Sequence, residues 1–118
     1  MLQDHINDWC IEYGVDAAKM DTQFSNLGQH LMGLTTFKHN DKGECTALID
    51  VHTCLEDHPL AVKAVAWHEY CHAEAWVADG QTEGHGDKWN SRRWRKPVLV
   101  LLDIFYAKVL FAFIGGRK

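Results

Sequence analysis

Apolar residues at intervals of three or four open the chain, and on a helix they would share one face: Leu2, Ile6, Trp9, Cys10 and Tyr13. Gly14 follows them as a helix stop. The pattern therefore predicts a helix over residues 2–13. Residues 16–30 continue with apolar positions at similar spacing, among them Met20 and Phe24, and predict a second helical stretch.

The middle of the chain favours strands. Residues 31–39 contain Leu34-Thr35-Thr36-Phe37, and residues 46–52 form a second run rich in the side chains that strands prefer. Asn40-Asp41-Lys42-Gly43 between them is a strong turn signal. The segment is therefore interpreted as a β-hairpin.

A long helix is predicted next. Pro59 fits the first helical position, and Gly80 is a C-terminal stop, so the helix should run from about residue 59 to Asp79. Residues 81–86 then form a loop, and residues 87–95 a short helix that ends before Pro97. Together with the hairpin these elements predict an α+β fold with a short antiparallel sheet.

The C-terminal residues 97–116 are strongly apolar. A membrane span needs about twenty such residues, but Asp103 and Lys108 interrupt the run and would each cost roughly 2.5–3.5 kcal/mol at the bilayer centre. We expect residues 97–118 to form a helix that packs on a domain made by residues 1–96. A tail anchor or an interfacial helix that contacts the membrane is the alternative.

The composition is that of a globular chain and limits the functions to consider. The 118 residues suit one domain, 47% of them are hydrophobic and 24% charged, and the net charge is −4 with histidine neutral. This balance argues against a general basic surface for nucleic acid, though not against a local patch. No signal peptide is visible at the N-terminus, so we expect a cytoplasmic protein.

The cysteines give no further metal motif, because no two of them have C-x-x-C spacing: Cys10, Cys45, Cys54 and Cys71. We expect reduced thiols, as in an intracellular protein. A disulfide between Cys45 and Cys54 is the alternative.

The long helix carries the most informative motif of the chain. His68-Glu69-Tyr70-Cys71-His72 has the pattern H-E-x-x-H. Residues four apart lie on the same face of a helix, so two imidazoles can bind one metal ion while the glutamate lies beside it. This is the arrangement of zinc peptidases, in which the glutamate is the general base.

A catalytic zinc site usually has a third protein ligand. The metzincin pattern fails, because Ala78 stands where that pattern requires histidine, and Glu74 lies on a different helix face. Glu83 and Asp87 are possible carboxylate ligands. His85 is the best candidate, since the flanking glycines would let the chain turn back from the helix end toward the metal.

The two motifs together resemble one known family. His68-Glu69-Tyr70-Cys71-His72-Ala73, followed after a loop by Gly84-His85-Gly86-Asp87-Lys88-Trp89, is similar to the SprT/Spartan group of zinc metallopeptidases, over roughly residues 43–95. In that group H-E-x-x-H-A is followed by H-G-x-x-[F/W]. The resemblance implies a small zincin-like domain in which His68, His72 and His85 bind zinc.

The resemblance also implies roles for two further residues. Glu69 would be the general base that activates water, and Trp89 would pack behind the site and hold the His85 loop. Asp87-Lys88 departs from the usual Pro-Glu, and the apolar tail stands in place of the cysteine zinc ribbon of many bacterial members. The second departure puts DNA targeting of the family's kind in doubt.

These observations predict a zinc-dependent endopeptidase that acts on a protein or peptide substrate. We expect residues 46–51 to be the sheet edge that pairs with an extended substrate. A non-catalytic zinc-stabilised binding module is the alternative, although such a site would have no need of Glu69. Residues 89–96 mix basic and aromatic side chains, which are interpreted as the solvated side of a short helix, as a membrane flank, or as a DNA contact through Arg92, Arg93, Arg95 and Lys96.

Overall fold

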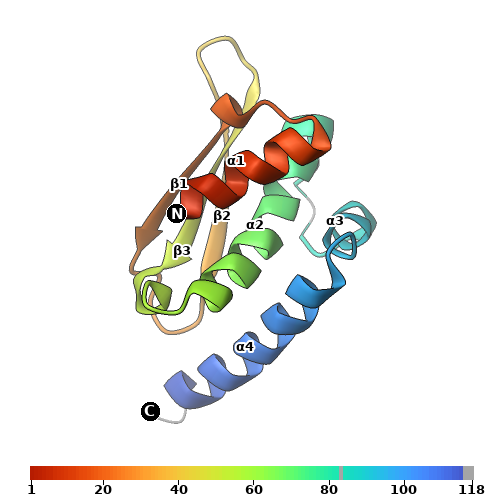
Figure 1. The fold of residues 1–118 in the computed structure, drawn as a ribbon. Coiled ribbons are helices and arrows are strands. Elements are labelled where there is room, and N and C mark those ends of the chain that lie inside the picture. Colours follow the sequence, from red (N-terminus) through yellow and green to blue (C-terminus); the bar gives the residue numbers. More distant parts are fainter. Residues whose placement is uncertain (83, 116–118) are drawn as a thin grey trace.

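The computed structural model describes residues 1–82 and 84–115, with side chains as far as residue 109. The described part has an α+β fold with a three-stranded mixed sheet of order β1-β3-β2 (Figure 1). Its strands are β1 (Met20–Ser25), β2 (Gly33–His39) and β3 (Cys45–His52). Its helices are α1 (Leu2–Tyr13), η1 (Ala17–Lys19), η2 (Thr53–Leu55), α2 (Pro59–Asp79), α3 (Asp87–Arg93) and α4 (Pro97–Gly115).

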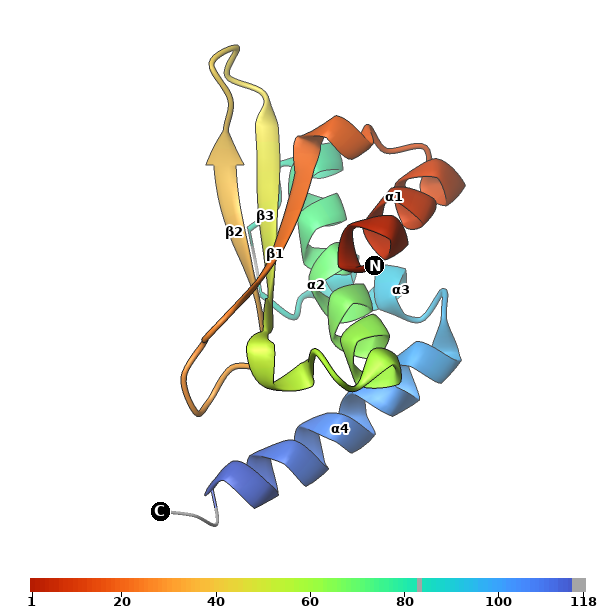
Figure 2. The ribbon, with the colours of Figure 1, turned by 60° about the vertical axis from the view of Figure 1, so that its left-hand side comes forward.

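The sheet and the helices form two layers. Helices α1 and α2 lie on the same side of the sheet, as Figure 2 shows. Helix α2 is the central element, since it packs against β2, β3, α1, α3 and α4. The core between the layers contains Ile49 and Val51 of β3 and Trp67 and Tyr70 of α2, each exposed by 1% or less. The apolar stripes of α1 and α2 therefore bury against one common core.

Most of the expected elements are confirmed. The predicted hairpin is present, because β2 pairs antiparallel with β3. The long helix begins at Pro59 and ends before Gly80, whose φ of 67° is the left-handed conformation that glycine adopts easily. The α+β class is confirmed as well.

The second helix predicted over residues 16–30 is wrong. That segment contains η1 and then β1, which pairs parallel with β3, so the sheet is mixed rather than antiparallel. Met20 and Phe24 are four residues apart, a spacing that places two side chains on the same side of either a helix or a strand. Pairing with β3 decided between the two.

The expected sheet edge is also wrong. Residues 46–51 lie in β3, which is the central strand, and β2 is the edge strand on the hairpin side. Thr35 of β2 pairs with the buried Ile49 of β3, so Thr35 and its alternate neighbours Gly33 and Phe37 face α2. Three positions of the edge strand β2 therefore face helix α2, which contains the H-E-x-x-H motif.

Helix α4 crosses the first half of α2 (Figure 2). Leu99 and Val100 are buried on the domain, whereas Val98, Leu101 and Phe105 on the opposite side are more than half exposed. Among the described residues, no helix combines the length and the apolar character that a membrane crossing requires. The alternative of an interfacial contact with a membrane stays a prediction.

The cysteines have free thiols. Cys45 begins β3 and Cys54 follows its end, and seven residue steps of strand span about 23 Å. A disulfide requires the two Cα atoms within about 7 Å. The alternative of a Cys45–Cys54 disulfide is therefore wrong for this fold.

Candidate metal centre

Helix α2 presents His68 and His72 one turn apart at the edge of the core. The residues around them are almost fully buried, Glu69 included, while the two imidazoles are partly exposed. Their ring centroids are 5.2 Å apart. The helix therefore holds both rings on one face, at the floor of an accessible cleft.

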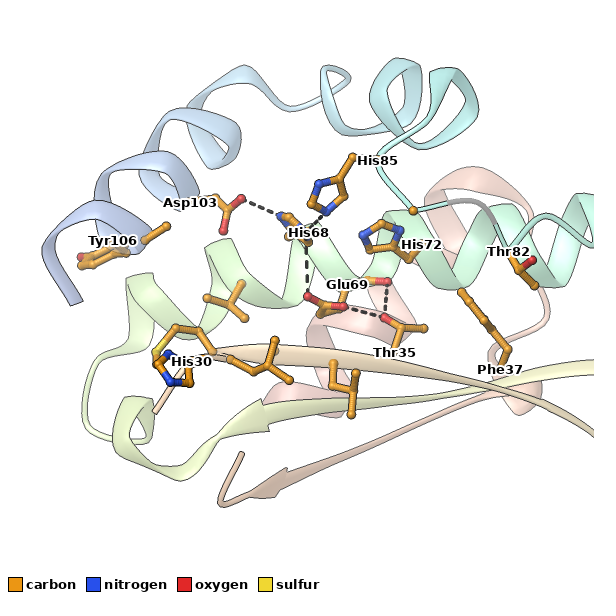
Figure 3. Close-up of a pocket in the computed structure, with 17 residues that line it drawn as sticks. His30, Thr35, Phe37, His68, Glu69, His72, Thr82, His85, Asp103 and Tyr106 are labelled. Carbon is orange, nitrogen blue, oxygen red and sulfur yellow. Dashed lines mark hydrogen bonds and ion pairs between the residues drawn. The ribbon is translucent and has the colours of Figure 1, made fainter. Parts of the chain in front are cut away.

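The loop between α2 and α3 brings His85 to the same place. The Nε2 atoms of His68 and His85 are 3.2 Å apart, and the ring centroids of His72 and His85 are 5.2 Å apart. One ligand atom from each of the three imidazoles lies within 4.8 Å of the other two. Figure 3 shows the three rings converging above Glu69.

The three rings fit a single metal ion. Zinc–nitrogen bonds of 2.0–2.1 Å in a tetrahedral site separate two ligand nitrogens by about 3.3 Å, close to the spacing of His68 and His85. The Nδ1 of His68 lies 2.7 Å from Oδ2 of Asp103, so a proton on Nδ1 would be donated to this carboxylate and would leave the lone pair of Nε2 directed at His85. This tautomer of His68 is the one in which Nε2 can bind a metal ion.

Glu69 lies next to this cluster in a buried position. Its Oε1 accepts a hydrogen bond from Thr35 Oγ1 at 2.8 Å, and its Oε2 lies 3.9 Å from His68 Nε2. The same hydroxyl oxygen is 3.1 Å from the main-chain oxygen of Glu69. Thr35 therefore fixes one carboxylate oxygen and leaves the other beside the metal position.

Burial and neighbouring charges shift the pKa values of the three histidines and of Glu69 in different directions. Burial and the charges of His68 and His85 lower the pKa of His72 to about 3, and burial and the charge of His68 lower the pKa of His85. Burial acts in the same sense on His68, but the Asp103 hydrogen bond and the charge of Glu69 outweigh it and raise its pKa. Burial also raises the pKa of Glu69. The surroundings of His72 and His85 therefore favour the neutral imidazole, the form that binds a metal ion.

Trp89 of α3 holds the His85 loop against α2. Its ring stacks on His85 at a centroid distance of 4.2 Å and on His72 at 5.1 Å. Its Nε1 donates to the main-chain oxygen of His68 at 3.1 Å. The buried indole thus contacts all three histidine positions.

A buried carboxylate fastens α3 to α2. Glu74, 6% exposed, accepts from Arg92 Nε at 3.1 Å and from both terminal nitrogens of Arg95 at 3.0 Å. Arg92 also binds Asp79 at 2.6 Å. Glu74 is therefore directed away from the metal position, in agreement with its low rank as a ligand.

The basic segment before α4 is largely engaged within the domain. Lys96 pairs with Glu12 at 3.0 Å, and the Arg93 guanidinium lies 4.5 Å from the Trp89 ring centroid. Trp89 is buried, but Trp94 is 44% exposed. The alternative of a DNA contact through this segment stays a prediction.

Two carboxylates, Asp87 and Glu83, were the other candidates for a third metal ligand. Asp87 is exposed at the first position of α3 and does not belong to the group that could hold a metal ion. Glu83 lies outside the described residues. Among the described residues, the histidine cluster is therefore the one group of this kind around α2.

A cleft of about 480 Å³ opens over the cluster. Figure 3 shows it running along β2, from His30 and Tyr106 at one end to Phe37 and Thr82 at the other, with Glu69 near the middle. Its walls come from β2, α2, the His85 loop and α4. An extended chain could therefore pass the three histidines along the free edge of β2.

The chain matches one known protein family over most of its length. The model of the SprT-like family matches residues 2–96. The chain belongs to the SprT-like family. Neither the curated proteins nor the solved structures gave a match. The matched segment contains Glu69, Trp89 and the three clustered histidines. Membership of the SprT-like family is consistent with a metallopeptidase.

Sequence reasoning missed two residues inside the SprT-like segment and one beyond it. Thr35 and Gly33 contact Glu69 from β2, and no local pattern distinguishes them. Asp103 lies outside the matched segment, and the sequence pattern marks it only as an interruption of an apolar run. A single acid in such a run needs a partner when it is buried, and that was the available signal.

Proposed function

We propose that this protein is a zinc-dependent endopeptidase that hydrolyses peptide bonds with Glu69 as general base. The observation that carries the proposal is a buried carboxylate 3.9 Å from the Nε2 of one of three convergent imidazoles. A purely structural zinc site is usually closed by four protein ligands. In the described part of the chain, the cluster contains three.

The donor set favours zinc among the common ions. Three imidazole nitrogens are typical of zinc sites that keep one position for water, whereas calcium and magnesium prefer oxygen ligands. His68, His72 and His85 would hold the ion. When bound there, zinc lowers the pKa of water to about 7 and polarises a substrate carbonyl.

Glu69 supports the proton transfers of such a reaction. Its Oε2 faces the space between the rings, so it can accept the proton of the attacking water and deliver it to the leaving amine. Burial raises the pKa of Glu69, which makes the carboxylate a stronger base for the first of these transfers. Thr35 keeps the carboxylate from rotating away.

The substrate backbone is expected to bind along β2. This strand is an edge of the sheet and lines the cleft with Gly33, Leu34, Thr35 and Phe37. An extended peptide can add a strand to such an edge through main-chain hydrogen bonds, which do not depend on sequence. The proposal therefore predicts a preference for unfolded or extended substrates.

Glu69→Gln tests the proposal. Purified full-length protein is assayed for zinc content and for cleavage of an unfolded protein. The variant should retain about one zinc per chain and lose cleavage by roughly 10²–10⁴-fold, because general-base catalysis contributes about that much. Glu56→Gln, an exposed glutamate outside the cleft, is the matched control and should cleave as the wild type does.

Two results would count against the proposal. If Glu69→Gln cleaved at the wild-type rate, the activity would not come from this site. If the zinc-loaded wild type were inert toward unfolded proteins, with and without DNA, the alternative of a zinc-stabilised binding module would replace the peptidase.

A further inference from the structure

Helix α4 contributes one carboxylate to the metal centre from outside the family segment. Asp103 Oδ2 lies 2.7 Å from His68 Nδ1, and both side chains are mostly buried, with 17% and 20% of their surfaces exposed. Residue 103 lies beyond the matched residues 2–96. We propose that Asp103 is a positioning residue that orients His68 toward the metal.

The geometry of the pair supports this role. An imidazole has two nitrogens, and only one of them can carry the lone pair for the metal when the ring is neutral. When Asp103 accepts a hydrogen bond from the Nδ1–H group, the lone pair of the neutral ring is on Nε2, which lies 3.2 Å from the Nε2 of His85. A second partner of this kind fixes both the tautomer and the ring orientation of a ligand and raises its basicity.

The position of the carboxylate is determined by packing. Leu99 and Val100, on the preceding turn of α4, are buried in the domain, and Leu102 and Tyr106 pack against its core. Asp103 therefore lies on a helix that is packed against the domain, and not on a loop. Figure 3 shows it reaching His68 on the side opposite Glu69.

Among the described side chains of α4, the charge of Asp103 has no comparable partner. Lys108 is five residues away and exposed, which places it on a different part of the α4 surface. A carboxylate buried without a hydrogen-bond partner is costly, and here His68 supplies that partner. The interaction therefore also links α4 to α2.

The inference rests on the metal centre of the proposed function, not on proteolysis. It predicts that the full-length Asp103→Leu variant binds zinc about 10–100-fold more weakly than the wild type, the usual cost of losing such a partner. Leucine has a similar shape and suits an apolar helix. Zinc affinity is measured by competition with a chromophoric chelator, and the His68 tautomer by nitrogen chemical shifts of the metal-free protein.

Two further variants separate positioning from a general effect. Asp103→Glu keeps a carboxylate and should recover part of the affinity, whereas Asp41→Asn, which removes one exposed charge in the β2–β3 turn, should bind zinc as the wild type does. If Asp103→Leu does not fold, Asp103→Asn replaces it and should still weaken binding several-fold.

Zinc affinity of the folded position-103 variant within twofold of the wild type would overturn the proposal, as would an unchanged His68 tautomer. Failure of the peptidase proposal gives a different result, because an inert wild type would still bind zinc more tightly than the Asp103 variant.

Discussion

At Gly33 the edge strand β2 passes close to helix α2, and Gly33→Ala tests that contact. A Cβ atom at Gly33 would lie 2.7 Å from Val65 Cγ1, 2.8 Å from Glu69 Cγ and 2.9 Å from Glu69 Oε2. Favourable contacts between such atoms are about 3.5–4.0 Å. The φ of Gly33 is not positive, so the residue is needed for space and not for an unusual backbone conformation.

The magnitude follows from how far these neighbours must move. Each contact is roughly 1 Å too short, and Val65 and Glu69 are both buried, so relief requires a shift of β2 against α2. Overpacking of this kind costs about 1–3 kcal/mol, partly offset by about 0.4–1 kcal/mol because alanine stiffens the unfolded chain. We expect a net loss of about 1–2 kcal/mol in the free energy of unfolding.

The cleavage rate should fall by a larger factor than the loss of unfolding free energy alone would suggest. The clash displaces the Glu69 carboxylate, and a misplacement of about 1 Å in a reacting group can cost about 10²-fold in rate. The three atoms nearest to the added Cβ belong to Val65 and Glu69 and not to a metal-site histidine, so zinc content should stay unchanged. Urea denaturation, zinc analysis and cleavage of an unfolded protein measure the three quantities.

Gly84→Ala is the matched control for stability. An added Cβ there meets nothing within 4 Å, and the φ of Gly84 is not positive. Its free energy of unfolding should stay within about 0.5 kcal/mol of the wild type. The reasoning about space would be refuted if Gly33→Ala were as stable and as active as the wild type.

Two other predictions follow from the same site. Trp89→Ala should reduce the free energy of unfolding by about 3–5 kcal/mol, because it removes a buried indole. It should also weaken zinc binding, because the His85 loop loses the ring that it stacks on. Denaturation measures the first effect and chelator competition the second, and zinc binding as tight as that of the wild type would contradict the second. In metal-free protein, His72 should reduce stability as the pH falls from 6.5 toward 3, because its pKa is about 3 when folded and about 6.5 when unfolded, so that the unfolded chain binds the extra proton. Between pH 7 and pH 5 this amounts to at most about 2 kcal/mol, and less for a partly exposed ring. His72→Gln should therefore lose less stability than the wild type over this interval in urea denaturation, and equal losses would show that His72 is not the cause.

The sequence alone determined the elements whose signals are local. Pro59 and Gly80 bound α2, and a spacing of four residues places two imidazoles on one helix face, whatever the rest of the chain does. The turn at residues 40–43 predicted the hairpin for the same reason. The paired motifs also indicated the SprT-like family, which the match over residues 2–96 confirms.

Only the tertiary structure decided which distant segments meet. Residues 20–25 became a strand because β3 was available for parallel pairing, and this pairing made β3 central and left β2 as the edge beside the cleft. Asp103 meets His68 only because α4 crosses α2. Periodicity describes the faces of one element, whereas the docking of two elements depends on side chains far apart in the chain, so neither contact could be derived from local spacing.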